Sequence, residues 1–139
     1  MRTLAILATT AVVALAGCGG DSGSGSESTT TAARGYSGDP VAVAQEYVDA
    51  FGSGDYAKAC SLIDAEALEK ITQTGTVECE QVYEQGGTDI EQTQAEFDGA
   101  TVSDPKIAGD RGSVGVKTAS GKDIRLPVVI EDGQWKVAS

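Results

Sequence analysis

The chain has 139 residues, of which 10 are Lys or Arg, 21 are Asp or Glu and none is His, giving a formal net charge of −11 at pH 7. This acidity argues against a nucleic-acid partner, because such binding depends on basic side chains that neutralise phosphates. It also argues against electrostatic attachment to anionic lipids. The lack of histidine excludes Ser-His-Asp and Cys-His catalysis.

Residues 1–17 have the order of a lipoprotein signal peptide: Arg2, an apolar run from 4 to 15, and then small residues. The sequence Leu15-Ala16-Gly17-Cys18 resembles the bacterial lipobox, which implies cleavage before Cys18 and lipidation of its thiol. We therefore expect a lipid on Cys18 to hold the protein at the extracytoplasmic face of the cell membrane. The alternatives are a retained membrane helix, for which the run is too short, and a plain secretory signal.

Residues 19–37 consist almost entirely of Gly, Ser, Thr and Ala, with no large aliphatic side chain. Such a composition buries too little apolar surface to offset the entropy lost on ordering. We expect residues 18–37 to be the lipidated cysteine and a flexible linker, with a root-mean-square span of about 24 Å. Residues 38–139 are then enough for one domain with a modest core.

The domain is expected to begin with helices. Asp39 followed by Pro40 is typical of an N-cap and a first helical residue. Apolar side chains then recur at helical spacing as far as Phe51, and the Gly52 and Gly54 pair predicts the end of this helix.

Further short helices are predicted after the first. Asp55 and Asp64 are suited to cap a second and a third helix, the third ending near Gly75. Another helix is expected around Cys79, stopped by glycines at 86–87. The polar residues 88–98 are expected to form a loop with some helix.

Cys60 and Cys79 remain once Cys18 is lipidated. In an oxidising, extracytoplasmic compartment such a pair indicates a structural disulfide. A bridge across a loop of this length stabilises a domain by roughly 3 kcal/mol in the chain-entropy model. No metal site is expected, because zinc usually takes four ligands and the chain has no histidine. No cofactor motif occurs either, since the chain has no phosphate-binding glycine loop.

After Gly99 the sequence changes to short runs typical of strands. The runs are 102–107, 113–118, 124–130 and 134–137, with turns expected at 109–112, 119–122 and 132–133. Asp132-Gly133 is a strong two-residue hairpin signal. It sets Glu131 opposite Gln134, Ile130 opposite Trp135, Val129 opposite Lys136 and Val128 opposite Val137. This register gathers Val128, Ile130, Trp135 and Val137 on one face.

Helices followed by an antiparallel meander indicate an α+β fold with the helices packed on one face of the sheet. The alanine-rich segment 41–51, the segment 54–60 beginning Gly-Asp-Tyr, and the closing segment 131–137 resemble the nuclear transport factor 2-like (cystatin-like) superfamily. The resemblance is greatest to its small lipoproteins of unknown function. It implies a curved, cone-like sheet around the helices, which in that superfamily holds a small molecule, holds an active site or is filled.

Two functions follow from this resemblance. In the first, the domain is a non-catalytic binding module for a small apolar or amphipathic ligand, lined by Tyr47, Phe51, Ile130 and Trp135. In the second, the cone is filled and the domain is an accessory subunit that docks on another cell-envelope protein. An internal cavity favours the first, and an exposed apolar patch on the outer sheet face favours the second.

Catalysis is the third and least favoured function. Without histidine, an enzyme on this chain would need an Asp and a Tyr meeting in an apolar pocket, as in ketosteroid isomerase. Tyr47, Tyr56, Tyr83 and Asp49 are the nominal candidates. Tyrosines in amphipathic helices usually serve the core, so we expect no catalytic residues.

Overall fold

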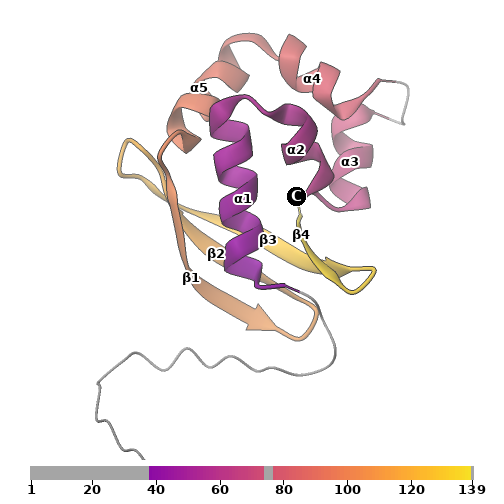
Figure 1. Cartoon of the computed structure of the whole chain (residues 1–139), viewed down its shortest axis with the longest axis vertical. Helices are drawn as coiled ribbons and strands as arrows, with labels where there is room; N and C mark the ends of the chain where they lie inside the picture. Colours follow the sequence, from indigo (N-terminus) through magenta and orange to yellow (C-terminus); the bar gives the residue numbers. More distant parts are fainter. Residues whose placement is uncertain (1–37, 74–76, 139) are drawn as a thin grey trace, which may run out of the picture. The chain divides into compact units, whose positions relative to one another are not determined.

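The computed structural model describes residues 38–73 and 77–138. The expected signal peptide, the lipidation site at Cys18 and the linker lie outside the described residues. Helices precede strands in the described part (Figure 1), which confirms the expected α+β fold class. The helices are α1 (Pro40–Ser53), α2 (Tyr56–Ser61), α3 (Ala65–Thr72), α4 (Cys79–Gln85) and α5 (Gly87–Phe97). The strands are β1 (Thr101–Ala108), β2 (Arg111–Lys117), β3 (Asp123–Glu131) and β4 (Gln134–Val137).

Aspartates begin the first three helices, as expected from the sequence. The Asp39 side chain accepts a hydrogen bond from Val41 N, and the Asp55 and Asp64 side chains do the same for the third residue of α2 and of α3. These bonds satisfy amide groups that have no partner inside a helix. Gly54, with φ of +79°, ends α1 in a left-handed conformation that favours glycine.

The four strands form an antiparallel meander in the order β1-β2-β3-β4. The pairing of β3 with β4 confirms the predicted register at all four positions, from Glu131 opposite Gln134 to Val128 opposite Val137. Asp132 and Gly133 both have positive φ, 50° and 77°, as a two-residue hairpin with right-handed twist requires.

Two local predictions are wrong. Ala108 pairs with Arg111, so the first turn contains only Gly109 and Asp110, and Gly112 lies inside β2. Residues 88–97, expected to form a loop with some helix, belong entirely to α5. This helix packs closely on α1, because Gly52 has no side chain: a Cβ atom there would lie 2.8 Å from Asp98 N.

The helices cover one face of the sheet. Helix α1 packs against all four strands, with α2 and α5 beside it, and α4 packs against α2, α3 and α5 (Figure 1). The interior has two parts. The helical core consists of Tyr47, Val48, Ala50, Phe51, Ala59, Ile63, Ala67, Cys79, Phe97, Ala100, Val116 and Val137. The α1–sheet cluster consists of Ala44, Val114, Val128 and Trp135, with Val41, Val43, Val102, Leu126 and Ile130 partly buried around them.

Both outer strands of the sheet are covered in part. The segment that joins α2 to α3 runs along β4, where Val137 N donates to Leu62 O (2.8 Å) and Asp64 N donates to Val137 O (2.9 Å). On β1, the Gln45 amide donates to Ala100 O (3.1 Å) and accepts from Val102 N (2.8 Å). The Gln45 side chain thus takes the place of a neighbouring strand at the start of β1.

An irregularity breaks the middle of β1. Its register with β2 shifts between Ser103 and Lys106, so that Asp104 and Pro105 form a bulge. Arg125 reaches this bulge from β3, with its guanidinium on Asp104 O (2.6 Å) and Asp104 Oδ2 (2.8 Å). Gly115 of β2 lies beneath, where a Cβ atom would be 3.6 Å from the Arg125 guanidinium.

Candidate functional site

The structure does not bring the four predicted ligand-binding residues to one place. Tyr47 and Phe51 are buried in the helical core. Trp135 is buried in the α1–sheet cluster, and Ile130 is partly buried against that cluster. Val102 and Leu126 pack against both groups and join them. Tyr47 and Phe51 therefore have different surroundings from Ile130 and Trp135, and the two pairs are not equally accessible to a ligand.

Phe51 is enclosed by aromatic rings. Its ring centroid lies 5.0 Å from that of Tyr83, 5.5 Å from Tyr56, 5.6 Å from Phe97 and 6.0 Å from Tyr47. Most of these pairs meet edge to face, an arrangement that stabilises aromatic clusters beyond their buried area. A ligand that reached Phe51 would have to displace one of these rings.

The tyrosine hydroxyls in the helical core are paired. Burial, assisted by Tyr83, holds the pKa of Tyr47 well above its usual value. Burial also raises the pKa of Tyr83, which is hydrogen-bonded to Tyr47. The Tyr56 hydroxyl donates to Gln94 Oε1 at 3.1 Å. Burial thus favours the neutral form of Tyr47 and of Tyr83, and the Tyr56 hydroxyl is hydrogen-bonded within the fold.

Asp49, the carboxylate considered with these tyrosines, lies apart from them. It is exposed on α1 and accepts a hydrogen bond from Gln45 Nε2 at 2.8 Å. Tyr47, two residues away on the same helix, is buried against the aromatic rings. The Asp and Tyr pair that carbon-acid chemistry would need is not assembled by these residues.

The second predicted pair, Ile130 and Trp135, lies at one end of the sheet. The two residues face each other across the β3–β4 hairpin, and Ile130 N donates to Asp110 O in the β1–β2 turn at 2.7 Å. From α1, Val41 and Val43 pack on the same cluster and stay partly exposed. Aliphatic side chains therefore surround Trp135 where the first turn of α1 meets the sheet.

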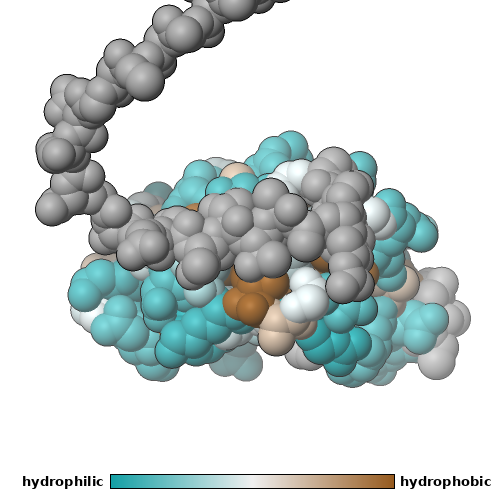
Figure 2. All heavy atoms as spheres, turned by 90° about the horizontal axis from the view of Figure 1, so that it is seen from below, coloured by the Kyte–Doolittle hydropathy of each residue, from teal (hydrophilic) through white to brown (hydrophobic). Residues whose placement is uncertain are grey.

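Ile107 adds to this aliphatic surface and was missed from the sequence. It is 40% exposed and shares its face of the sheet with Val128, through Gly112. Its Cδ1 occupies the space above Gly112, where a Cβ atom would lie 2.7 Å away. We call Val41, Val43, Ile107 and Ile130 the apolar rim. Figure 2 shows hydrophobic atoms between hydrophilic surroundings on the face seen from below.

Cys60 and Cys79 form a disulfide, as the sequence leads one to expect. Their Sγ atoms are 2.01 Å apart and their Cα atoms 6.1 Å apart. Cys60 lies in α2 and Cys79 opens α4, so the bridge joins two helices that also pack on each other. Its role here is to hold α4, and with it Tyr83, against the helical core.

An open hollow that no sequence pattern indicated lies between α5 and the β2–β3 turn. Gln92, Ala95, Glu96 and Ser120 line it, with an open volume of about 350 Å³. The Ser120 hydroxyl donates to Glu96 Oε2 at 2.7 Å, and hydrogen bonds from Thr118 and Ser120 lower the pKa of Glu96. These bonds fasten the turn to α5, and the residues are too far apart in the sequence for a motif to reveal them.

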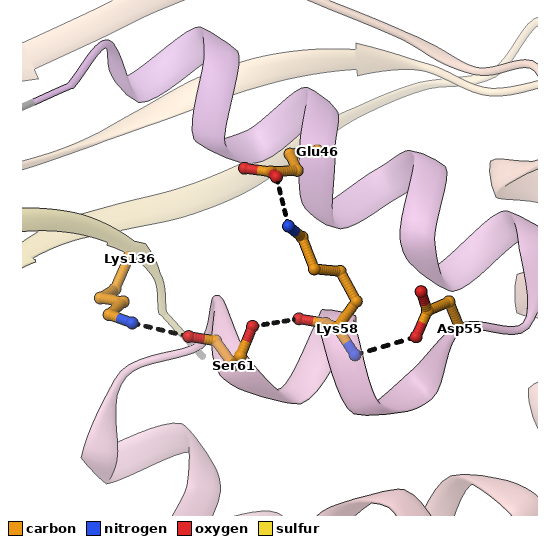
Figure 3. Close-up of polar contacts among 5 residues, drawn as sticks. All are labelled: Glu46, Asp55, Lys58, Ser61 and Lys136. Carbon is orange, nitrogen blue, oxygen red and sulfur yellow. Dashed lines mark hydrogen bonds and ion pairs between the residues drawn. The ribbon is translucent and has the colours of Figure 1, made fainter.

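Charged side chains also meet between α1, α2 and β4 (Figure 3). Lys58 of α2 forms an ion pair with Glu46 of α1 at 2.5 Å, and this contact raises the pKa of Lys58. Lys136 of β4 donates to Ser61 O at 2.6 Å, at the end of α2. A cation at a helix C-terminus complements the helix dipole. The group ties α2 to its neighbours, and each of its two ammonium groups has a partner within it.

Within residues 38–73 and 77–138, no three His, Cys, Asp or Glu side chains come together as a metal site would need. None of the helices in these ranges has the length and apolar character to span a membrane.

Comparison with known proteins gives a likeness of fold. No family model matches the chain, and no curated protein matches it. A similar solved structure is the 2.00 Å crystal structure of a protein named a candidate NTF2-like transpeptidase, from Campylobacter jejuni. The match has a TM-score of 0.49 and 16% sequence identity, and it covers 73% of this chain and 99% of that chain. At these values the likeness does not bear on what the present chain binds or catalyses.

Proposed function

We propose that this chain is a lipoprotein anchored through Cys18 at the extracytoplasmic face of the cell membrane. Its domain, in this proposal, is a non-catalytic binding module for a small apolar or amphipathic ligand. The lipobox-like Leu15-Ala16-Gly17-Cys18 supports the anchor. The disulfide between Cys60 and Cys79 is consistent with an oxidising compartment.

The apolar rim carries the proposal of ligand binding. Its aliphatic side chains are partly exposed to solvent around the buried indole of Trp135. Ligand sites are mostly apolar, with few polar groups. Of the four residues expected to line the site, Ile130 belongs to the apolar rim and Trp135 lies beneath it, whereas Tyr47 and Phe51 lie in the helical core and would not contact a ligand on the rim.

One observation favours the second candidate, an accessory subunit of a cell-envelope complex. The aromatic rings around Phe51 fill the space that a deeply buried ligand would need. In that case the apolar rim would be part of a protein–protein interface, in which buried aromatic residues are the usual anchors.

Native mass spectrometry tests which candidate is right. The domain is released from its own membrane by proteolysis within residues 19–37 and measured under native and denaturing conditions. A discrete mass above that of the polypeptide, lost on denaturation, would support the binding module and identify the ligand class. A bare polypeptide mass would favour the accessory subunit, and cross-linking in intact membranes would then identify its neighbour.

A further inference from the structure

The first described residue of the domain lies beside the apolar rim. Gly38 is the first described residue, and a Cβ atom on it would lie 3.9 Å from Val43 Cγ2. Asp39 caps α1 by accepting from Val41 N at 2.9 Å. Both rim residues of α1 are thus within a few residues of the point where the chain turns toward its expected anchor.

If Cys18 carries the proposed lipid, the number of residues between it and Gly38 limits how far this end of the domain can lie from the membrane. Residues 19–37 join Cys18 to Gly38. A Gly/Ser-rich chain of this length has a root-mean-square span of about 24 Å. A tether so short raises the effective concentration of bilayer lipid at the rim far above that of any free ligand.

Charge favours the same orientation. The segment 77–98, which contains α4 and α5, has seven acidic and no basic side chains. Figure 1 places α4 and α5 at the opposite end of the domain from the start of α1. In contrast, residues 99–138 carry five acidic and six basic side chains. Anionic headgroups repel the acidic end and tolerate the nearly neutral sheet end.

The chemistry of the rim suits an acyl chain. Its four members are Val and Ile, and the side chain beneath them is the indole of Trp135. Aliphatic surface of this kind binds hydrocarbon through loss of contact with water and does not select for hydrogen-bonding groups.

From these four observations we infer that the ligand of the apolar rim is an acyl chain of a lipid in the membrane to which Cys18 is anchored. The inference rests on the proposed function, because it names the ligand class of the same site. It also fixes the orientation of the domain: the apolar rim faces the bilayer, and α4 and α5 point away from it.

Trp135, the chain's only tryptophan, allows a direct test. The full-length lipidated protein is reconstituted in phosphatidylcholine vesicles whose acyl chains carry bromine, which quenches tryptophan fluorescence on contact. We expect strong quenching relative to unbrominated vesicles. Ile107→Gln should weaken this quenching about fivefold or more, because it removes one exposed aliphatic side chain from the rim. Val77→Gln is the matched control, since Val77 is also 40% exposed but lies between α3 and α4.

The possible results separate a failure of the acyl-chain inference from a failure of the proposed binding function. Quenching by brominated lipid that Ile107→Gln weakens and Val77→Gln leaves unchanged would support both. If brominated vesicles do not quench but bromobenzene in solution does, the binding module stands and the acyl-chain inference is wrong. If neither probe quenches the fluorescence of Trp135, the binding module and the acyl-chain inference are both wrong. Quenching that Ile107→Gln leaves unchanged would show that lipid reaches Trp135 without the rim, and would also overturn the inference.

Discussion

At the scale of single residues, the buried hydroxyl of Tyr47 makes stability depend on pH. Burial holds the pKa of Tyr47 well above its usual value in the folded protein, whereas an unfolded tyrosine ionises near pH 10. The folded state therefore binds the proton more tightly, and its stability is complete below about pH 10 and falls as the pH rises further. A tyrosine that is exposed in both states would cause no such loss.

Substitution of Tyr47 by Phe tests this dependence. At pH 8, Tyr47→Phe should lower the free energy of unfolding by about 1 kcal/mol, because the hydrogen bond with Tyr83 is lost. Above pH 10 the wild-type protein should lose more stability than the variant, so that the difference narrows. Urea unfolding at both pH values measures it. A difference that is constant with pH would mean that Tyr47 ionises freely in the fold.

Gly52 gives a second prediction at this scale. An Ala in a helix is normally more stable than a Gly by about 1 kcal/mol. Here a Cβ atom would lie 2.8 Å from both Asp98 N and Phe97 C, so α5 would have to move. Gly52→Ala should therefore destabilise the domain by about 1–3 kcal/mol. Ser53→Ala, on the next residue of α1, is the control and should change stability by less than about 0.5 kcal/mol.

At the scale of elements, the Cys60–Cys79 disulfide joins α2 to α4 across a sequence separation of 19 residues. Replacing both cysteines by Ser should lower the free energy of unfolding by roughly 3 kcal/mol, since the unfolded chain gains freedom. Urea unfolding of the two proteins measures the difference. Thiol titration of the unfolded, unreduced wild-type protein should find neither cysteine reactive, and two reactive thiols would contradict the bridge.

Gln45 connects α1 to the start of β1, and its removal should loosen that strand. Gln45→Ala leaves Val102 N and Ala100 O without their side-chain partner, at a cost of about 1–2 kcal/mol. Hydrogen exchange at the Val102 amide should become faster. Asp49→Ala is the control, because it removes only the exposed bond between Asp49 and Gln45. Equal exchange in both variants would mean that Gln45 does not protect the strand.

Some elements of the fold could be predicted from neighbouring residues in the sequence, and others could not. The β3–β4 register was predictable because Asp132-Gly133 specifies a turn and the apolar alternation agrees with it. The full helix over 88–97 was not, because this segment has few apolar residues and packs on α1 at Gly52, a contact between distant parts of the chain.

The candidate site was likewise predictable only where local sequence determines it. The pairing of Ile130 with Trp135 was predictable, because it follows from the hairpin turn. The contribution of Ile107 depends on the bulge in β1 and on Gly112, which was expected in a turn. A bulge changes the face of the sheet on which each later residue of the strand lies. The sequence did not predict the bulge in β1. The sequence also could not predict that Tyr47 and Phe51 lie in a different cluster from Trp135, because this depends on how the helices pack.

At the scale of the whole molecule, the proposed anchor is the property that decides where the protein acts. Cys18→Ala should abolish acyl labelling and move the protein from the membrane fraction to the soluble fraction, because lipid is the proposed attachment. Fractionation and metabolic labelling with a fatty acid measure this. Cys60→Ser serves as a control for loss of a cysteine as such. A Cys18 variant that stays with the membrane would refute lipid anchoring.

The covered and broken edge of β1 has a consequence if the protein is anchored at a membrane as we propose. Tethered copies meet far more often than copies in solution, and an exposed flat strand would invite them to pair edge to edge and aggregate. Gln45 occupies the first part of this edge, and the bulge at Asp104 and Pro105 breaks the next. Neither feature binds a ligand in our proposal, yet together they suit the domain to crowding on a surface without forming continuous sheets between neighbours.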